Sequence, residues 1–317
     1  MKKILITGGA GYIGVATAQF FLKKNFKVYI VDNLSTGNNL LKHKNYLFIK
    51  SDFSHKKITN LLIDEKIKNV IHLAASIDNY ESVLKPEEYY SNNYLKVKKL
   101  INNCEKANIE HFLFSSSAAV YGKVDSYKPI DEKYRCKPIT PYGKSKLLTE
   151  KLFIKAKFKT IILRYFNVAG PTFKNLYRQN FNGYKHLLKK LSDLRFSKKI
   201  NNFKINGKDY DTYDGTCVRD YIHVQDIAKI NYKAINLSNK ILKKNKYKIF
   251  NCGTSIEKSV LEIVKKFIIF GKIKLKIMFV KRRKGDPAFL LSQNKLLKNS
   301  FSIKLLGIDK IIKDLVK

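Results

Sequence analysis

The chain has 317 residues, of which 44% are hydrophobic, and this length and composition predict a globular protein with a sizeable core. Its formal net charge of +38 would by itself favour nucleic acid or an anionic membrane surface as a partner. However, only seven of the 63 basic residues are arginine, and the lysines are spread over nearly every expected helix surface, so we interpret the charge as compositional drift and expect no specific nucleic-acid partner.

Through the first half of the chain, short continuous apolar runs alternate with segments of helical periodicity. The runs cover residues 3–7, 27–32, 46–50, 69–74, 111–116 and 160–166. Parallel strands that are buried on both faces give such runs, so the pattern predicts an α/β fold with a doubly wound, Rossmann-type parallel sheet. Ligands bind beyond the carboxyl ends of the strands in these sheets. The residues expected to line that crevice are Gly8, Asp32, His72, Ser115 to Ser117 and Asn167.

After about residue 168 the alternation degrades. We expect a lysine-rich helical stretch over 184–199, strand-like pieces near 203–206 and 249–251, and a helical segment near 257–270. This pattern predicts a Rossmann domain over 1–168 and a smaller C-terminal substrate-binding lobe over 169–317, part of which returns to the main sheet. No linker rich in proline, glycine or serine separates the two, so we expect them to share an interface.

A glycine-rich turn follows the first expected strand. The segment ITGGAGYIG places Gly8, Gly11 and Gly14 between a strand and a helix, where a backbone turn approaches a pyrophosphate. Asp32 ends the second strand, where a carboxylate accepts hydrogen bonds from an adenosine ribose and repels a 2′-phosphate. The agreement of strand, glycines and acid favours an NAD site over a glycine turn that serves only helix packing.

A candidate proton relay lies downstream in PYGKSK. Tyr142 and Lys146 are four residues apart, on one face of a helix that Pro141 is suited to begin, and Ser117 ends an earlier strand. A nearby ammonium and a positive nicotinamide ring would both favour the phenolate of Tyr142 and make it a base for hydride chemistry at a carbinol. The alternative is a surface helix that carries the tyrosine and the lysine by chance.

The cysteine pattern and hydropathy bound the compartment. Four cysteines show neither a CxxC pair nor metal-ligand spacing, and nothing resembles a secretory signal, so we expect a reducing, cytoplasmic location and no metal. No apolar segment approaches the ~18 residues that a membrane-spanning helix needs. We therefore expect no membrane association.

The motifs occur in the order seen in the UDP-glucose 4-epimerases (UDP-galactose 4-epimerases) of the extended short-chain dehydrogenase/reductase family, which the chain resembles from residue 1 to about residue 310. The segments that carry this resemblance are GGAGYIG, VDNLSTGN, ESVLKPEEYYSNN, SSSAAVYG, PYGKSK, LRYFNVAG and DGTCVRDYIHV. It implies that Tyr142 is the acid and base, that Ser117 is its hydrogen-bonding partner to the sugar, and that Lys146 holds the nicotinamide ribose. Other cofactor contacts that the resemblance implies are Tyr12, Ile13, Asp32, Asn33, Asp52 and Asn92.

On the nucleotide-sugar side, the resemblance matches Asn167, Arg219 and Arg283 to the UDP portion, with Asp286 nearby and Leu290 bordering the C2 substituent of the sugar. A diphosphate suits the planar fork of arginine, which lysine does not imitate. For the KRRK segment that contains Arg283, a solvated charge run is the alternative.

The activity implied is that of an isomerase of galactose and carbohydrate metabolism. The C4 hydroxyl of a UDP-hexose is oxidised transiently with NAD, the 4-keto sugar rotates, and the hydride returns, so that UDP-glucose and UDP-galactose interconvert; the family also suggests a homodimer. Ala118 and Ala119 stand where nucleotide-sugar 4,6-dehydratases carry an Asp–Glu pair, and Asn206 where many family members place a phenylalanine against uracil. Two alternatives remain open: a 4-epimerase of UDP-N-acetylhexosamines or another nucleotide sugar, and a non-catalytic dinucleotide- or nucleic-acid-binding protein.

Overall fold

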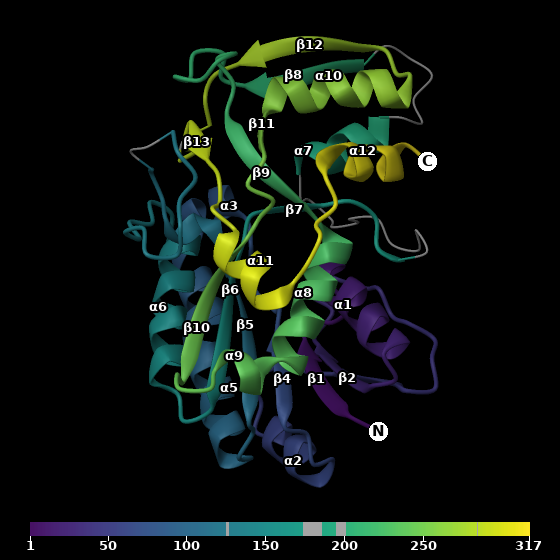
Figure 1. Cartoon of the computed structure of the whole chain (residues 1–317), viewed down its shortest axis with the longest axis vertical. Helices are drawn as coiled ribbons and strands as arrows, with labels where there is room; N and C mark the ends of the chain where they lie inside the picture. Colours follow the sequence, from purple (N-terminus) through teal and green to yellow (C-terminus); the bar gives the residue numbers. More distant parts are fainter. Residues whose placement is uncertain (125–126, 174–185, 195–200, 284) are drawn as a thin grey trace.

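A seven-stranded parallel sheet forms the larger part of the molecule (Figure 1). The structure is a computed structural model that describes residues 1–124, 127–173, 186–194, 201–283 and 285–317. The strand order is β10-β6-β5-β4-β1-β2-β3, which confirms the doubly wound parallel sheet that the apolar runs predicted. The strands are β1 (Lys3–Thr7), β2 (Lys27–Asp32), β3 (Tyr46–Lys50), β4 (Asn69–His72), β5 (His111–Ser117), β6 (Lys159–Tyr165) and β10 (Tyr247–Cys252).

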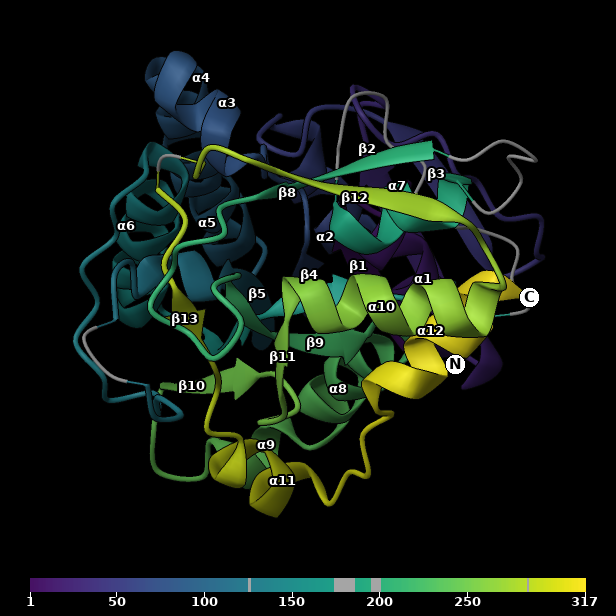
Figure 2. The same cartoon turned by 90° about the horizontal axis from the view of Figure 1, so that it is seen from above.

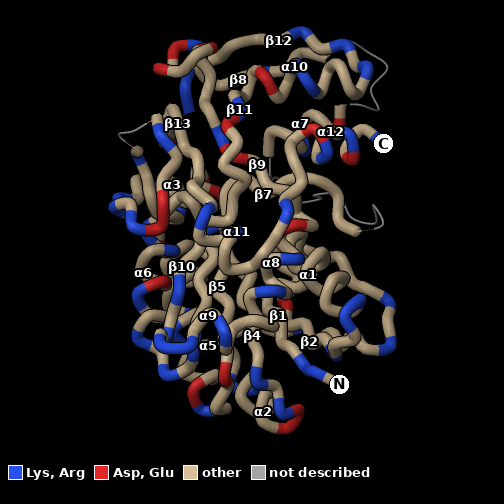
Figure 3. The backbone as a smooth tube through the Cα atoms, viewed as in Figure 1, with Lys and Arg blue, Asp and Glu red and all other residues tan. Residues whose placement is uncertain are grey.

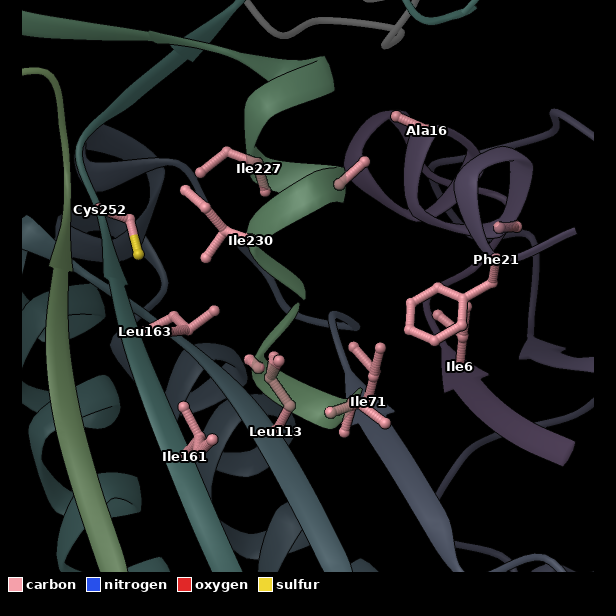
Figure 4. Close-up of a cluster of buried hydrophobic side chains, with 14 of the residues drawn as sticks. Ile6, Ala16, Phe21, Ile71, Leu113, Ile161, Leu163, Ile227, Ile230 and Cys252 are labelled. Atoms are coloured by element: carbon pink, nitrogen blue, oxygen red, sulfur yellow. The ribbon is translucent and has the colours of Figure 1, made fainter. Parts of the chain in front are cut away.

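Helices cover both faces of this sheet because side chains alternate along each buried strand. Ile6, Leu113 and Leu163 point to the face covered by α1 (Tyr12–Lys23) and α8 (Val224–Asn236), as Figure 4 shows. Along each strand, the residues that alternate with these pack on the opposite face. The helices there are α2 (Lys57–Asp64), α5 (Lys96–Lys106) and α6 (Pro141–Lys155).

Beyond the carboxyl ends of the strands lies the smaller lobe, at the opposite end of the long axis from the N-terminus (Figure 1), and Figure 2 looks down onto this lobe from above. One small sheet has the order β11-β9-β13 with β7 also paired to β9, and the other pairs β8 with β12 in parallel. Its elements are β7 (Asn167–Ala169), α7 (Leu187–Leu194), β8 (Asn201–Asn206), β9 (Val218–His223), β11 (Glu257–Ser259), α10 (Val260–Gly271), β12 (Leu275–Val280), β13 (Phe289–Leu290) and α12 (Ile308–Val316).

Several shorter elements complete the described chain. They are α3 (Asn79–Leu84), α4 (Pro86–Tyr90), a π-helical turn (Ser91–Leu95), a 3₁₀ turn (Ala118–Val120), α9 (Ser238–Ile241) and α11 (Lys295–Phe301). The second half of the chain also returns to the main sheet, because β10 pairs with β6 and α11 packs Leu297 and Phe301 into the same core as α8.

Two expected helices have different bounds in the structure. Of the stretch expected over 184–199, residues 187–194 form α7, whereas 184–185 and 195–199 lie outside the described residues. The helix expected near 257–270 begins at Val260, because Glu257–Ser259 pair with β9. There Ser259 and Glu262 form a reciprocal capping box that fixes the helix start.

In the described part of the chain, lysines and arginines occur along most elements of both parts of the molecule, and their positions on the backbone do not form one stripe (Figure 3). Among the described residues, no helix is long and apolar enough to cross a membrane.

Candidate active site

A cavity of about 910 Å³ lies where the carboxyl ends of the main sheet face the smaller lobe. We call it the main cavity. Parallel strands end at one edge of the sheet, so residues far apart in the chain meet there. The predicted site residues that line it are Gly8, Gly11, Tyr12, Ile13, Gly14, Asp32, Asn33, Asn92, Ser117, Tyr142, Lys146, Asn167, Arg219, Arg283, Asp286 and Leu290.

One prediction about a lining residue differs from the structure. His72 was expected in the crevice, but it is buried in the core, 2.6 Å from the Thr7 hydroxyl and stacked on Phe114. His72 ends β4, and its side chain lies on the same face of the strand as that of Val70. It therefore points to the face of the sheet covered by α2, α5 and α6 instead of into the cavity. Asp52 lies beside the cavity, where its carboxylate accepts hydrogen bonds from Lys96 and Ser54.

The glycine turn after β1 packs so closely against neighbouring backbone that Gly8 and Gly14 cannot carry side chains. Gly8 has φ +71°, and a Cβ there would lie 2.5 Å from the Ala74 backbone nitrogen. A Cβ on Gly14 would lie 2.2 Å from the Gly8 carbonyl oxygen. The turn leads into α1, at whose N-terminus no side chain caps the free backbone N–H groups. Such a helix start suits an anionic pyrophosphate.

Asp32 braces this turn and faces the main cavity. Its two carboxylate oxygens accept hydrogen bonds from the Ala10 and Leu34 backbone nitrogens, at 3.0 and 2.9 Å. Burial raises the pKa of this carboxyl, and these two backbone hydrogen bonds oppose the shift. The carboxylate, the glycine turn and the start of α1 therefore fit the ribose and pyrophosphate of NAD.

The tyrosine and lysine of the predicted relay lie at the start of α6, buried against β5. Thr140 caps the helix by accepting a hydrogen bond from the Gly143 backbone nitrogen, and Pro141 occupies its first turn. The Lys146 ammonium donates a hydrogen bond of 2.8 Å to the Ser115 carbonyl and sits 4.9 Å from the centre of the Phe114 ring. Both relay side chains are thus oriented by the edge of the sheet.

The electrostatics of the relay differ from the simplest expectation. Burial raises the pKa of the Tyr142 phenol above its ordinary value, and a hydrogen bond with Ser117 opposes this. Burial also lowers the pKa of Lys146 to about 7, which the Glu150 carboxylate opposes. In the protein alone, burial therefore outweighs the effect of the Ser117 hydrogen bond on the pKa of the phenol.

The lobe side of the main cavity is cationic. Arg219 on β9 donates to the Val218 carbonyl at 2.9 Å, and its guanidinium lies 4.0 Å from the Asp286 carboxylate. Arg283 also lines the cavity. Its neighbour Arg282 lines the cavity too, and it pairs with Asp209 at 2.7 Å.

Four positions that the sequence singled out for substrate choice meet in this cavity. Ala118 and Ala119 line it close to Ser117, and Asn206 lines it at the end of β8. Leu290 on β13 both borders the cavity and packs with Tyr121 and Phe166 in a buried cluster. Leu290 is thus a core residue as well as a wall of the site.

Sequence reasoning missed Asn93, which organises the cavity loop behind the predicted Asn92. Its buried side chain donates to the Ser76 carbonyl and accepts from the Ser76 backbone nitrogen, both at 2.8 Å. Its own carbonyl accepts a hydrogen bond from Thr149 on α6. The sequence alone does not show which of the two adjacent asparagines is buried, because the π-helical turn determines this.

Comparison with known proteins agrees with this geometry. Residues 4–253 match the NAD dependent epimerase/dehydratase family. The chain is 37% identical over 327 residues to the UDP-glucose 4-epimerase of Pasteurella multocida (strain Pm70), a match that covers 98% of this chain and 95% of that protein.

Solved structures match over nearly the whole chain. The UDP-glucose 4-epimerase from Bifidobacterium longum in complex with NAD+ and UDP has a TM-score of 0.91 and 29% identity, over 99% of this chain and 97% of that one. The UDP-Glc/GlcNAc 4-epimerase from the human pathogen Campylobacter jejuni has a TM-score of 0.83 and 35% identity, over 100% of this chain and 98% of that one.

Proposed function

The chain belongs to the NAD dependent epimerase/dehydratase family, and from this premise we propose that it interconverts UDP-glucose and UDP-galactose. Its likeness to proteins named UDP-glucose 4-epimerase confirms the resemblance drawn from the motifs. The observation that carries the proposal is the convergence of Tyr142, Lys146 and Ser117 with the glycine turn and two arginines in one cavity. A non-catalytic nucleotide-binding protein would need the turn but not the relay.

NAD is the cofactor, held by the glycine turn, the start of α1 and Asp32. The chemistry that it supplies when bound is acceptance of a hydride from C4 of the hexose and return of that hydride to the other face. The phenolate of Tyr142, which the positive nicotinamide ring of bound NAD would favour, takes the C4 hydroxyl proton during oxidation and returns it on reduction, while Ser117 orients the same hydroxyl. Lys146 binds the nicotinamide ribose. We assign the remaining cofactor contacts to Tyr12, Ile13, Asn33, Asn92 and, from beside the cavity, Asp52.

Rotation of the 4-keto sugar requires a firm hold on UDP and a loose hold on the hexose. Arg219 and Arg283 supply planar donors for the diphosphate, with Asn167 and Asp286 beside them. The sugar then turns about its diphosphate link without leaving the cavity. Ala118 and Ala119 carry no proton-transfer group, which favours epimerisation over a 4,6-dehydration that needs a second acid and base.

A 4-epimerase of UDP-N-acetylhexosamines is the second candidate. Leu290 gives the wall of the cavity an apolar side chain shorter than tyrosine, and the similar Campylobacter jejuni protein is named for both UDP-Glc and UDP-GlcNAc. We expect UDP-glucose and UDP-galactose to be the main pair, with some tolerance of the N-acetyl forms.

The organisation of the enzyme is part of the same proposal. We divide the chain into an NAD-binding Rossmann domain over 1–168 and a nucleotide-sugar-binding lobe over 169–317, with β10 returning to the main sheet. A cytoplasmic location is supported by the four cysteines, all of them free. A homodimer is supported by exposed apolar side chains on segment 79–95, which a second copy would cover. They are Tyr80, Val83, Leu84 and Leu95.

The direct test is incubation of the purified protein with UDP-galactose. We expect UDP-glucose to accumulate until the two sugars reach equilibrium, without net reduction of added NAD. Failure to form UDP-glucose, or a requirement for stoichiometric NADH, would contradict the proposed function. Light scattering of the same sample tests the dimer separately.

A further inference from the structure

A buried ion pair lies directly behind the relay. Glu150 follows Lys146 by one turn of α6, and Arg164 on β6 clasps its carboxylate with two hydrogen bonds, of 3.0 and 2.7 Å. The two side chains are only 2% and 4% exposed, and neither lines the main cavity. Removing two charges from water costs about as much as their attraction returns, so such a pair contributes little net stability. Because the pair lies beside the site, we expect a role in the site other than a contribution to stability.

The pair is tied to the relay through three consecutive serines at the end of β5. The Ser116 hydroxyl donates a hydrogen bond of 2.5 Å to Glu150. On one side of it, the Ser115 carbonyl accepts the Lys146 ammonium, and on the other, Ser117 is hydrogen-bonded to Tyr142. The Glu150 carboxylate thus fastens the middle residue of a segment whose two neighbours contact both relay side chains.

Arg164 anchors Glu150 to the rest of the fold. Its guanidinium donates to the Tyr121 hydroxyl at 2.9 Å and to the Glu132 carbonyl at 3.2 Å. The Tyr121 hydroxyl in turn donates to the Asn251 side chain on β10, at 2.6 Å. The carboxylate is therefore held by several elements of the main sheet and does not follow the motions of α6 alone.

Glu150 is the acidic group that acts on Lys146. Burial lowers the pKa of Lys146 to about 7, and the charge of Glu150 opposes this. Three other titratable side chains lie at or against the relay: burial raises the pKa of Tyr142 and of Tyr89, whose ring packs against it, and lowers that of His72. Arg164 lies on the far side of Glu150, whose carboxylate it pairs.

We propose that Glu150, fixed by Arg164 and Ser116, is a positioning residue that keeps Lys146 in its ammonium form and holds the serine segment to which Lys146 and Tyr142 bind. This inference rests on the proposed function, because the ammonium matters only where it binds the cofactor ribose. The carboxylate acts through Lys146 and touches neither sugar nor cofactor.

The test is Glu150→Gln, which keeps the shape of the side chain and removes its charge. We expect the high-pH limb of kcat/KM for UDP-galactose to move to lower pH by about one unit, and activity above that limb to fall about tenfold. Without the charge of Glu150 the pKa of Lys146 is lower, so Lys146 loses its proton at a lower pH. KM for UDP-galactose should stay near the parent value. As a readout independent of turnover, the variant purified at pH 8 should carry less NAD per chain.

Glu150→Gln also leaves Arg164 unpaired, so a second variant separates charge from folding. The double variant Glu150→Gln/Arg164→Gln removes both charges of the buried pair. We expect its pH profile to be shifted as in the single variant Glu150→Gln. The matched control is Asp226→Asn on α8, which removes another buried carboxylate, one that binds Lys229 and the Leu306 backbone nitrogen away from the relay. It should lose stability without a change in the pH profile.

Each result decides the inference. A parent-like pH profile in Glu150→Gln would overturn it, as would a double variant that returns to the parent profile, since Glu150 would then serve only to neutralise Arg164. If the parent itself does not epimerise UDP-galactose, the proposed function fails instead, so the two failures are distinguishable.

Discussion

Asp220 accepts a hydrogen bond of 2.5 Å from the hydroxyl of Ser292, and this contact joins two strands of the smaller lobe that carry site residues. Asp220 follows Arg219 on β9, and Ser292 lies two residues after Leu290 on β13. The same carboxylate accepts bonds from the backbone of Thr254 and Ser255, which follow β10. One buried acid therefore sets the position of the cavity walls that carry Arg219 and Leu290 relative to the main sheet.

Asp220→Asn should destabilise the protein while its fold is retained. In the parent, the groups around the Asp220 carboxylate donate hydrogen bonds to it. The amide nitrogen of the variant would find no acceptor among them, so we expect a loss of about 1–3 kcal/mol in the free energy of unfolding. Urea denaturation of the variant and the parent measures it. Since bound UDP stabilises the lobe, added UDP should recover part of the loss. An unchanged denaturation midpoint would contradict the structural role of Asp220.

Tyr142→Phe should reduce epimerisation by roughly 10²-fold or more, because the variant has no group to take the C4 hydroxyl proton. The ring packs against Tyr89 at 6.4 Å between centroids, a contact that phenylalanine preserves. The variant should therefore stay folded and bind UDP as the parent does. Turnover near the parent rate under matched conditions would remove Tyr142 from the mechanism.

The cofactor residues allow a paired comparison of two aspartates. The purified parent should carry NAD without any being added, since a cycle that returns its hydride gains nothing by releasing the cofactor. Asp32→Asn should carry less NAD and discriminate less against NADP, because the carboxylate both braces the Ala10 turn and repels a 2′-phosphate. Release and chromatographic identification of the bound dinucleotide measure both effects. NADP in the parent would contradict the assignment.

Asp52→Asn completes the comparison. The Asp52 carboxylate is bound by Lys96 at 2.6 Å, so we expect a smaller effect on NAD content than for Asp32→Asn. An equal or larger loss would mean that Asp52 reaches the cofactor despite its position beside the cavity.

The sequence predicted the main sheet and a few residues of the cavity lining from one pattern, whereas the resemblance implied most of the other site residues. Continuous apolar runs identify strands buried on both faces, and parallel strands bring their carboxyl ends to one edge. Side-chain direction is a separate matter. His72 ends a strand as Asp32 does, yet the alternation of β4 points it into the core, and the strand bounds were not known closely enough to decide this.

Residues that act through long-range partners were also beyond sequence reasoning. Glu150 occurs on a helix rich in lysine, where a glutamate is typical of an exposed face. Only the structure reveals that it is buried and paired with Arg164 on β6. Asp52 follows a strand end, and its pairing with Lys96 depends on how α5 packs. In both cases the partner is brought close by tertiary packing that no local pattern indicates.

Leu290→Tyr should narrow the substrate range. Leu290 pairs with Arg219 across β13 and β9, lines the main cavity, and packs against Phe166, so a larger ring cannot turn away into the protein interior without displacing its neighbours. It should instead project toward the sugar, where the N-acetyl group of a hexosamine at C2 would meet it. A steric change of this size is worth about 1–3 kcal/mol, or ~10- to 200-fold in discrimination.

The measurement is the ratio of kcat/KM for UDP-galactose to kcat/KM for UDP-N-acetylgalactosamine, in the parent and in Leu290→Tyr. Leu290→Met serves as the matched control, because a swap that conserves volume leaves the wall in place and should leave the ratio close to that of the parent. A general loss of activity with an unchanged ratio would mean that tyrosine disturbs only the core cluster. Leu290 would then have no part in substrate selection, because a residue that borders the C2 substituent must affect the two sugars unequally.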